Sequence, residues 1–216
     1  MMKLYGFGAT RSLRVLWALL DLDAKFEFVP VNLMAGEQRS SQFLKLNLAG
    51  KIPVLVDDDL VLTESAAIVL YLAEKFPGRG LLPMDLEPRA QVYRWVFFAM
   101  TELESALWRM TRHTFLYPPE KRSAAEIALA AEDFRTMATV LDRHLIGRSF
   151  IVGDSFTAAD CVAAYIVDWA AEKNLLDELP ELRAYRSRLH QRTNAAPHFS
   201  EARLRFEGVA GAELRR

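Results

Sequence analysis

The sequence predicts an α/β domain in the order strand, helix, strand, helix, strand, strand, helix, followed by an all-helical domain. Short runs typical of strands alternate with segments of helical periodicity over the first third of the chain. Pro77-Gly78 and the prolines at 83 and 88 mark a boundary. Beyond it, residues 89–115 contain no glycine or proline, which favours a long helix. We therefore expect domains at 1–78 and 88–216, joined by a linker at 79–87.

The elements of the first domain follow from its apolar pattern. The segment 11–22 has apolar residues at helical spacing, whereas 54–56 is an apolar run that ends in three aspartates. Pro53 lacks an N–H group and should open the strand at 54 instead of lying within it. We expect strands at 3–7, 26–31, 54–56 and 60–62, and helices at 11–22, at 41–46 and from residue 65 onward.

The second domain contains long segments bounded by proline and glycine. Pro118-Pro119 ends the first of them, and Gly147 closes the second. We expect helices at 89–115, 120–145, 157–173 and 182–193, with a short one after Pro197.

Composition excludes several classes of protein. The 216 residues include 27 Lys and Arg against 28 Asp and Glu, a balance that gives no electrostatic reason to expect nucleic acid or an anionic membrane as partner. Cys161 is the only cysteine, so no intrachain disulfide forms and a reducing compartment fits. No apolar run reaches the roughly 18 residues of a membrane span, and no signal-peptide pattern opens the chain. We expect a cytoplasmic protein.

The segment around Pro53 predicts a ligand-binding site. A bond before proline is the kind that can be cis at modest cost, and the main chain of Ile52 could pair with an extended peptide as an added strand would. The helix that opens at Ser65 presents unpaired N–H groups and a positive dipole end, which suit a carboxylate. With Lys51 nearby, these features favour a small, charged, peptide-like ligand.

Three motifs carry a resemblance to a known family. Residues 47–55, Asn-Leu-Ala-Gly-Lys-Ile-Pro-Val-Leu, followed by Glu64-Ser65, resemble the glutathione-site signature of cytosolic glutathione transferases. Residues 153–160 are similar to the capping box of that family's C-terminal domain. The resemblance spans the chain and implies a thioredoxin-like first domain with a four-stranded mixed sheet. It also implies a helical second domain that forms an electrophile pocket, and assembly as a homodimer.

The resemblance implies a group that stabilises the glutathione thiolate after the first strand. A free thiol has a pKa of about 8.5, which hydrogen bonds to the thiolate lower. Family members place Tyr, Ser or Cys there, and Thr10 matches the hydroxyl position, with Ser12 as the second candidate. Both residues are equally suitable as plain helix N-caps. Tyr5 belongs to the strand, so the resemblance favours a bacterial, serine/threonine-type enzyme over the tyrosine and cysteine types.

Further ligand contacts are implied by the same resemblance. Ser65 would bind the γ-glutamyl carboxylate and Glu64 the amino group, unless they serve only the helix end. Lys51 and Gln38 would reach the glycine carboxylate, and both could instead be solvated loop residues. Ile52 and Pro53 complete the set.

Candidates on the long helix are weaker. The resemblance implies that Glu102 and Glu104 approach the ligand of the partner subunit, although Phe97 stands where the cysteine-type class has an asparagine. The apolar residues around 89–98 suit a dimer interface. The electrophile pocket is expected to be lined by Phe7, Trp108, Arg112 and Phe115, although an aromatic stripe at helical spacing is more often core. The four histidines show no metal-ligand spacing, and we assign no metal.

Three functions remain open at this point. The first is a glutathione transferase that conjugates glutathione to a small hydrophobic electrophile, a detoxification activity. The second is a non-catalytic relative that binds RNA polymerase or another protein. The third is a glutathione-dependent disulfide reductase or peroxidase, which the lack of a cysteine near residue 10 disfavours.

Overall fold

The predicted strands form one four-stranded mixed sheet in the order β2-β1-β3-β4 in the computed structural model, which describes residues 1–207 and side chains through residue 203. The strands are β1 (Met2–Gly6), β2 (Phe26–Pro30), β3 (Val54–Asp57) and β4 (Leu60–Thr63). β1 pairs parallel with β2 and antiparallel with β3, which in turn pairs antiparallel with β4. This confirms the predicted order of elements and the thioredoxin-like class of the first domain.

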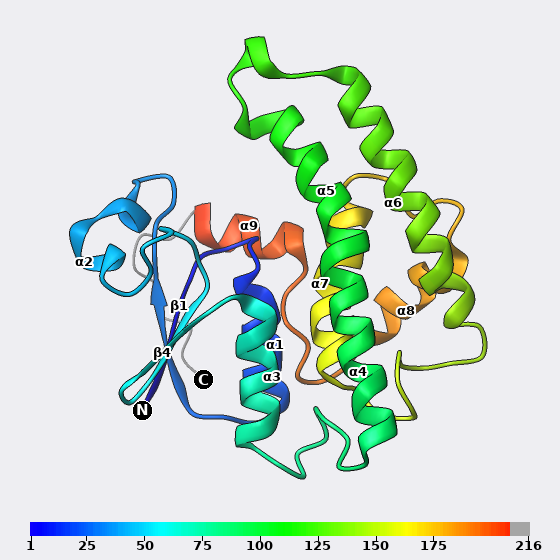
Figure 1. Cartoon of the computed structure of the whole chain (residues 1–216), viewed down its shortest axis with the longest axis horizontal. Coiled ribbons are helices and arrows are strands. Elements are labelled where there is room, and N and C mark those ends of the chain that lie inside the picture. Colours follow the sequence, from blue (N-terminus) through cyan, green and yellow to red (C-terminus); the bar gives the residue numbers. More distant parts are fainter. Residues whose placement is uncertain (208–216) are drawn as a thin grey trace. The chain divides into compact units, whose positions relative to one another are not determined.

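Helices cover both faces of this sheet. α1 (Ser12–Asp21) and α3 (Ser65–Lys75) lie side by side on one face (Figure 1). The short α2 (Ser41–Leu44), preceded by a 3₁₀ turn η1 (Glu37–Arg39), lies toward the other. There Phe43 packs in a small apolar cluster with Val31 and Val54. The Ser40 hydroxyl starts α2 by accepting a hydrogen bond from the Phe43 N–H at 3.2 Å.

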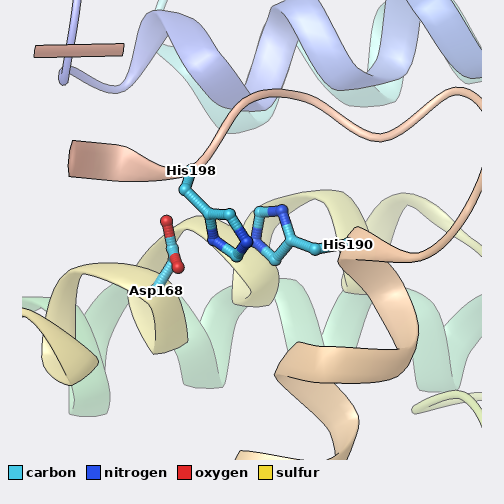
Figure 2. Close-up of side chains that lie close together, drawn as sticks. All are labelled: Asp168, His190 and His198. Carbon is cyan, nitrogen blue, oxygen red and sulfur yellow. The ribbon is translucent and has the colours of Figure 1, made fainter. Parts of the chain in front are cut away.

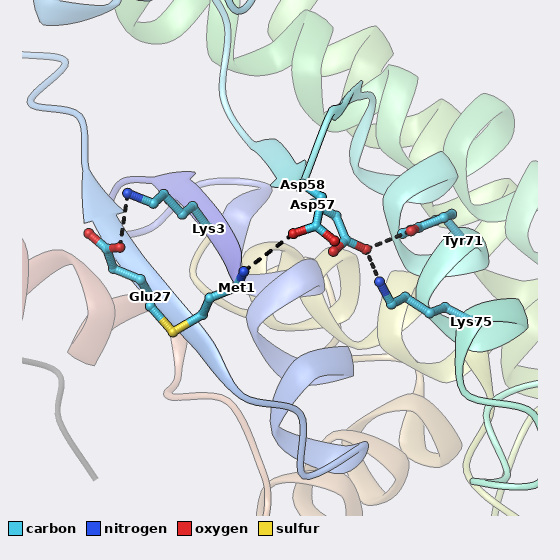
Figure 3. Close-up of polar contacts among 7 residues, drawn as sticks. All are labelled: Met1, Lys3, Glu27, Asp57, Asp58, Tyr71 and Lys75. Atoms are coloured by element: carbon cyan, nitrogen blue, oxygen red, sulfur yellow. Dashed lines mark hydrogen bonds and ion pairs between the residues drawn. The ribbon is translucent and has the colours of Figure 1, made fainter.

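Acidic residues at the end of β3 tie the sheet to α3. Asp57 is buried and accepts hydrogen bonds from the Tyr71 hydroxyl at 2.6 Å and from the Lys75 ammonium (Figure 3). Burial raises the pKa of Asp57, but the hydrogen bonds from Lys75 and Tyr71 and the charge of Lys75 outweigh it and lower the pKa overall. The hydrogen bond between Tyr71 and Asp57 raises the pKa of Tyr71. The carboxylate is therefore held in its charged form.

The second unit is helical, and its long first helix is interrupted. The stretch predicted as one helix is α4 (Leu86–Phe98), η2 (Ala99–Leu103), α5 (Glu104–Thr111) and η3 (Arg112–Leu116), in which η2 and η3 are π-helical turns. A 3₁₀ turn η4 (Pro119–Lys121) precedes α6 (Ala124–His144), which starts late because Ser123 accepts a hydrogen bond from the Glu126 N–H. The remaining helices are α7 (Ala158–Ala171), α8 (Pro180–His190) and α9 (Phe199–Glu207).

The predicted capping box is present and fully buried. Asp160 accepts hydrogen bonds from the N–H and hydroxyl of Thr157 at 2.8 and 2.9 Å, from the Ile151 N–H at 3.0 Å and from the Tyr185 hydroxyl at 2.8 Å. Burial raises the pKa of Asp160 and raises the pKa of Tyr185 well above 10. These bonds join the start of α7 to α8 and to the loop before it.

Contacts divide the chain into two units, and the division differs in one respect from the predicted domains. One unit is Pro83–Leu189, and the other is Met1–Leu82 together with the chain from His190 as far as it is described. The segment after α8 groups with the first unit because Arg192 pairs with Asp21 on α1. In addition, the His190 ring lies 5.0 Å from the Trp17 ring and stacks on His198 at 3.6 Å between centroids (Figure 2).

None of the helices within residues 1–207 is long and apolar enough to cross a membrane.

Candidate active site

The two hydroxyl candidates lie where the turn after β1 meets α1, and neither occupies the N-cap position. α1 begins at Ser12, with Arg11 in the N-cap position. The turn is closed by hydrogen bonds from the Thr10 N–H to the Gly8 carbonyl at 2.7 Å and from the Leu13 N–H to the Thr10 carbonyl at 3.0 Å. Arg11 therefore occupies the N-cap position instead of Thr10 or Ser12, while Thr10 Oγ1 accepts the N–H of Ser12, the first residue of α1.

The two hydroxyl groups form a closed set of hydrogen bonds with Phe7. The Thr10 hydroxyl donates to the Phe7 carbonyl at 2.5 Å, and Thr10 Oγ1 accepts the Ser12 N–H at 3.3 Å. The Thr10 and Ser12 hydroxyl oxygens lie 3.0 Å apart, and Ser12 Oγ accepts the Phe7 N–H at 3.4 Å. A hydroxyl has a single proton, and that of Thr10 points to the carbonyl, so Ser12 is the donor between the two oxygens.

Exposure separates the two candidates. Ser12 is only 2% exposed, whereas Thr10 is half-buried and retains a face toward solvent. Gly6 makes this burial possible, because a Cβ atom on Gly6 would lie 2.7 Å from Ser12 Oγ. Thr10 is thus the more exposed of the two residues.

The segment before β3 has the geometry expected of a peptide-binding edge. The Ile52–Pro53 bond is cis, as the sequence suggested, and β3 starts directly after it at Val54. The Asn47 side-chain amide donates to the Lys51 carbonyl at 2.7 Å and fixes the preceding turn, while the Lys51 side chain is exposed. Ile52 is half-buried, Pro53 is buried, and Ile52 lies against the cluster of Phe43 and Val54.

Gln38 lies beside this turn. It belongs to η1, and a Cβ atom on Gly50 would lie 2.9 Å from the Gln38 carbonyl, so the two segments are in close contact. The Gln38 Oε1 atom is buried and accepts no hydrogen bond from any residue up to 203. A buried polar atom of this kind usually has a water or ligand partner. Gln38 thus lies on η1, in close contact with Gly50, the residue before Lys51.

The start of α3 combines a buried serine with a buried arginine. Ser65 is the first residue of α3 and is 2% exposed, and its Oγ accepts a hydrogen bond from Arg14 Nη1 at 3.1 Å. Arg14 is fully buried. Glu64 precedes the helix with a φ of 66°, a left-handed conformation that is uncommon outside glycine, and its side chain is exposed. The guanidinium charge and the helix N-terminus together create a positive potential at this end.

The residues predicted to act from the long helix differ in their exposure. Glu104 is only 3% exposed, so it faces the interior and cannot contact a partner subunit. Glu102 is exposed and lines a groove of about 380 Å³ between α5 and α6, near the ion pair of Arg109 with Asp133. Val92 and Val96 are buried within this chain, and the large apolar side chains exposed on α4 are Leu86, at 79%, and Phe97, at 63%.

The proposed electrophile-pocket residues lie on both units. Trp108 is half-buried on α5, while Arg112 and Phe115 are exposed on η3. The Arg112 guanidinium lies 4.8 Å from the centre of the Tyr117 ring. Phe7 directly follows β1 in the first unit and belongs to the hydrogen-bonded turn with Thr10. The pocket itself stays a prediction.

Arg14 and Gly6 are the site residues that sequence reasoning missed. Arg14 is a charge among the buried residues of α1, and a charge inside an apolar helical stripe is a signal that the sequence does contain. Gly6 carried no such signal, because its requirement for space depends on the position of Ser12.

The sequence of this chain is similar to that of known proteins over both of its halves. Residues 1–74 match the glutathione S-transferase N-terminal domain, and residues 107–193 match the glutathione S-transferase C-terminal domain. Glutathione S-transferase F10 of Arabidopsis thaliana is 31% identical over 190 residues, which cover 84% of this chain and 88% of the relative.

Solved structures of glutathione S-transferases have the same fold as this chain. A glutathione S-transferase from Xylella fastidiosa superposes with a TM-score of 0.83 at 26% identity, covering 97% of this chain and 100% of that one. Glutathione S-transferase-I, solved with bound lactoylglutathione, superposes with a TM-score of 0.77 at 26% identity, covering 90% of this chain and 96% of that one. A thioredoxin-like domain followed by helices, with a ligand edge at a cis-proline, defines this class of enzyme. The chain belongs to the glutathione S-transferase family.

Proposed function

We propose that the protein binds reduced glutathione in its first unit, lowers the pKa of the thiol through the Thr10 hydroxyl, and transfers the thiolate to a small hydrophobic electrophile. The observation that carries this proposal is the half-buried residue Thr10 in the turn before α1, with its hydroxyl oxygen 3.0 Å from that of the buried Ser12. The lactoylglutathione bound to the related transferase supports a glutathione derivative as ligand.

The tripeptide would bind across the edge formed by Ile52 and Pro53. The Ile52 main chain would pair with the cysteinyl part of glutathione as an added strand. Lys51 and the Gln38 amide would hold the glycine carboxylate at one end. At the other end, the Ser65 hydroxyl and the α3 N-terminus would hold the γ-glutamyl carboxylate.

Glu64 would bind the remaining charge of the ligand. Its side chain is exposed at the α3 N-terminus, next to Ser65. The glutathione α-amino group would pair with this carboxylate, and the two charges of the γ-glutamyl part would then have opposite partners.

The chemistry needs a stabilised thiolate and nothing covalent from the protein. A hydrogen bond from the Thr10 hydroxyl to sulfur favours the ionised form, so the thiol loses its proton nearer to neutral pH. The sulfur then forms a bond to the electrophilic carbon, and a displaced group leaves with its electron pair. Positioning of the two reactants supplies the rest of the rate enhancement.

The finer assignments rest on the same residues. A hydroxyl at position 10 and Tyr5 within β1 support the serine/threonine type over the tyrosine and cysteine types, and a bacterial origin stays a prediction. A homodimer, with Glu102 of one subunit near the ligand of the other, is supported by the exposure of Glu102 and Phe97. Detoxification in the cytoplasm is the corresponding physiological role.

Cys161 argues against a mechanism through a protein thiol. It is the only cysteine in the sequence and is fully buried on α7, so a mixed disulfide with glutathione has no accessible partner. The glutathione site residues also give the polymerase-binding alternative no specific support.

Calorimetry with reduced glutathione, followed by conjugation to 1-chloro-2,4-dinitrobenzene, tests the proposal. We expect saturable binding of glutathione and an increase in absorbance from the conjugate that depends on the protein. Lys45→Ala, a change of an exposed lysine near the turn, is the control and should leave both signals unchanged. Absence of binding at millimolar glutathione would overturn the proposal.

A further inference from the structure

We propose that Ser12 is a positioning residue that makes the Thr10 hydroxyl an obligate donor, so that the site selects the thiolate of glutathione over its thiol. This inference rests on the proposed function, because it concerns how Thr10 meets the sulfur. In this role Ser12 acts through Thr10 and does not contact the ligand directly.

The argument begins with the lone pairs of Thr10 Oγ1. A hydroxyl oxygen has two lone pairs and one proton. The Ser12 hydroxyl lies 3.0 Å from Thr10 Oγ1, and the Ser12 N–H donates to the same oxygen at 3.3 Å. With both lone pairs occupied by Ser12, Thr10 can act toward a third group only as a donor.

The third group is the Phe7 carbonyl. The Thr10 proton goes to this oxygen at 2.5 Å, so a ligand sulfur must compete for it. A thiolate is a charged acceptor and forms the stronger hydrogen bond. A neutral thiol would need an acceptor for its own proton, and Thr10 offers none. The arrangement therefore favours binding of the ionised form.

The Ser12 hydroxyl is already engaged within the turn, so we assign it no direct contact with the sulfur. It also packs so closely against Gly6 that an added Cβ atom there would lie 2.7 Å from its Oγ. Its oxygen also accepts the Phe7 N–H at 3.4 Å, and its own proton goes to Thr10 because the Thr10 proton goes to the Phe7 carbonyl. Donation from Ser12 in turn polarises the Thr10 hydroxyl and strengthens it as a donor.

The test is the pKa of glutathione's thiol when bound, read from thiolate absorbance in the ultraviolet during a pH titration. In Ser12→Ala the hydroxyl donor is lost while the N–H donor remains, so we expect the bound thiol's pKa to rise by roughly 0.5–1 unit, a loss of about three- to tenfold in thiolate near neutral pH. Ser12→Cys, with a weaker donor of similar shape, should fall between Ser12→Ala and the wild type.

A double mutant decides whether Ser12 acts through Thr10. In a Thr10→Val background, Ser12→Ala should cause no further change in the pKa of the bound thiol. S-methylglutathione, which has no ionisable thiol, should bind equally to the wild type and to Ser12→Ala, which shows that the site remains folded. A merely structural role would weaken its binding.

The outcomes separate this inference from the proposed function. A wild type that binds no glutathione or leaves its thiol pKa unchanged would overturn both. If Ser12→Ala lowers the pKa of the bound thiol as much as the wild type does, only the role of Ser12 is overturned. If Ser12→Ala shifts the pKa of the bound thiol equally in the wild-type and Thr10→Val backgrounds, the role of Ser12 is also overturned, because Ser12 would then act independently of Thr10.

Discussion

Arg14 on α1 donates a hydrogen bond of 3.1 Å from its Nη1 atom to Ser65 Oγ at the start of α3. Both residues are buried, so this bond joins the two helices inside the first unit. Because Arg14 has no acceptor atoms, the Ser65 oxygen is the acceptor and its proton stays available to a ligand. The helix that begins near Thr10 is thus bonded to Ser65, the residue proposed to bind the γ-glutamyl carboxylate.

Ser65→Ala should weaken glutathione binding about 10- to 100-fold, since a hydrogen bond to a charged group contributes roughly 1.5–3 kcal/mol. Calorimetry measures the loss. The matched control is Ser123→Ala, which removes the cap of α6 and should cost on the order of 1 kcal/mol of unfolding free energy without changing the affinity. An unchanged affinity in Ser65→Ala would show that the γ-glutamyl carboxylate binds elsewhere.

Lys51→Ala should weaken glutathione binding modestly, by up to about fivefold, because an exposed ion pair contributes roughly 1 kcal/mol or less. The difference from the wild type should shrink as salt rises, since salt screens exposed charges. Titrations at low and high ionic strength check this, with Lys45→Ala as the control. A loss as large as that expected for Ser65→Ala would mean that Lys51 becomes buried in the complex.

Tyr185→Phe should lower the free energy of unfolding by about 1–3 kcal/mol, because it removes one donor from the fully buried Asp160 carboxyl group. Urea unfolding followed by circular dichroism measures the change. Glutathione affinity should not change, because this network lies in the second unit. A stability equal to that of the wild type would show that the remaining bonds to Asp160 suffice.

Asp57→Asn should reduce stability near neutral pH and flatten its dependence on pH in acid. The pKa of Asp57 is lowered in the folded protein, so its contribution is present above the unfolded value near 3.8 and is lost as the pH falls through the folded value. Unfolding free energies measured between pH 3 and 7 test this. An identical acid slope in the wild type and Asp57→Asn would show that the pair with Lys75 and Tyr71 does not contribute.

Most of the fold was predictable because local pattern decided it. Pro53 placed the start of β3 correctly, and Thr157 with Asp160 predicted the start of α7. The π-helical turns at 99–103 and 112–116 were not predictable, because their sequence continues the same helical pattern. The return of the C-terminal segment to the first unit depends on the pairing of Arg192 with Asp21, far apart in the chain.

The position of the site stays a prediction, and its internal arrangement could not be read from the sequence. The resemblance put Thr10 first and Ser12 second, whereas residue type alone did not separate two small hydroxyl residues near a helix start. The structure adds the burial of Ser12 against Gly6, which is a tertiary fact. Glu104 was misjudged for the same reason, because sequence spacing alone does not say which face of a long helix is covered.

The central claim is that the Thr10 hydroxyl holds the glutathione thiolate, and the pKa of the bound thiol in Thr10→Val tests it most directly. Valine keeps the shape of threonine and removes only the donor, so the pKa should rise by about 1–2 units, as expected for a hydrogen bond to a charge of roughly 1.5–3 kcal/mol. Thr10→Ser keeps the donor and should stay close to the wild type. A thiol pKa in Thr10→Val equal to that in the wild type would contradict the claim and assign activation to the main-chain N–H groups at the start of α1.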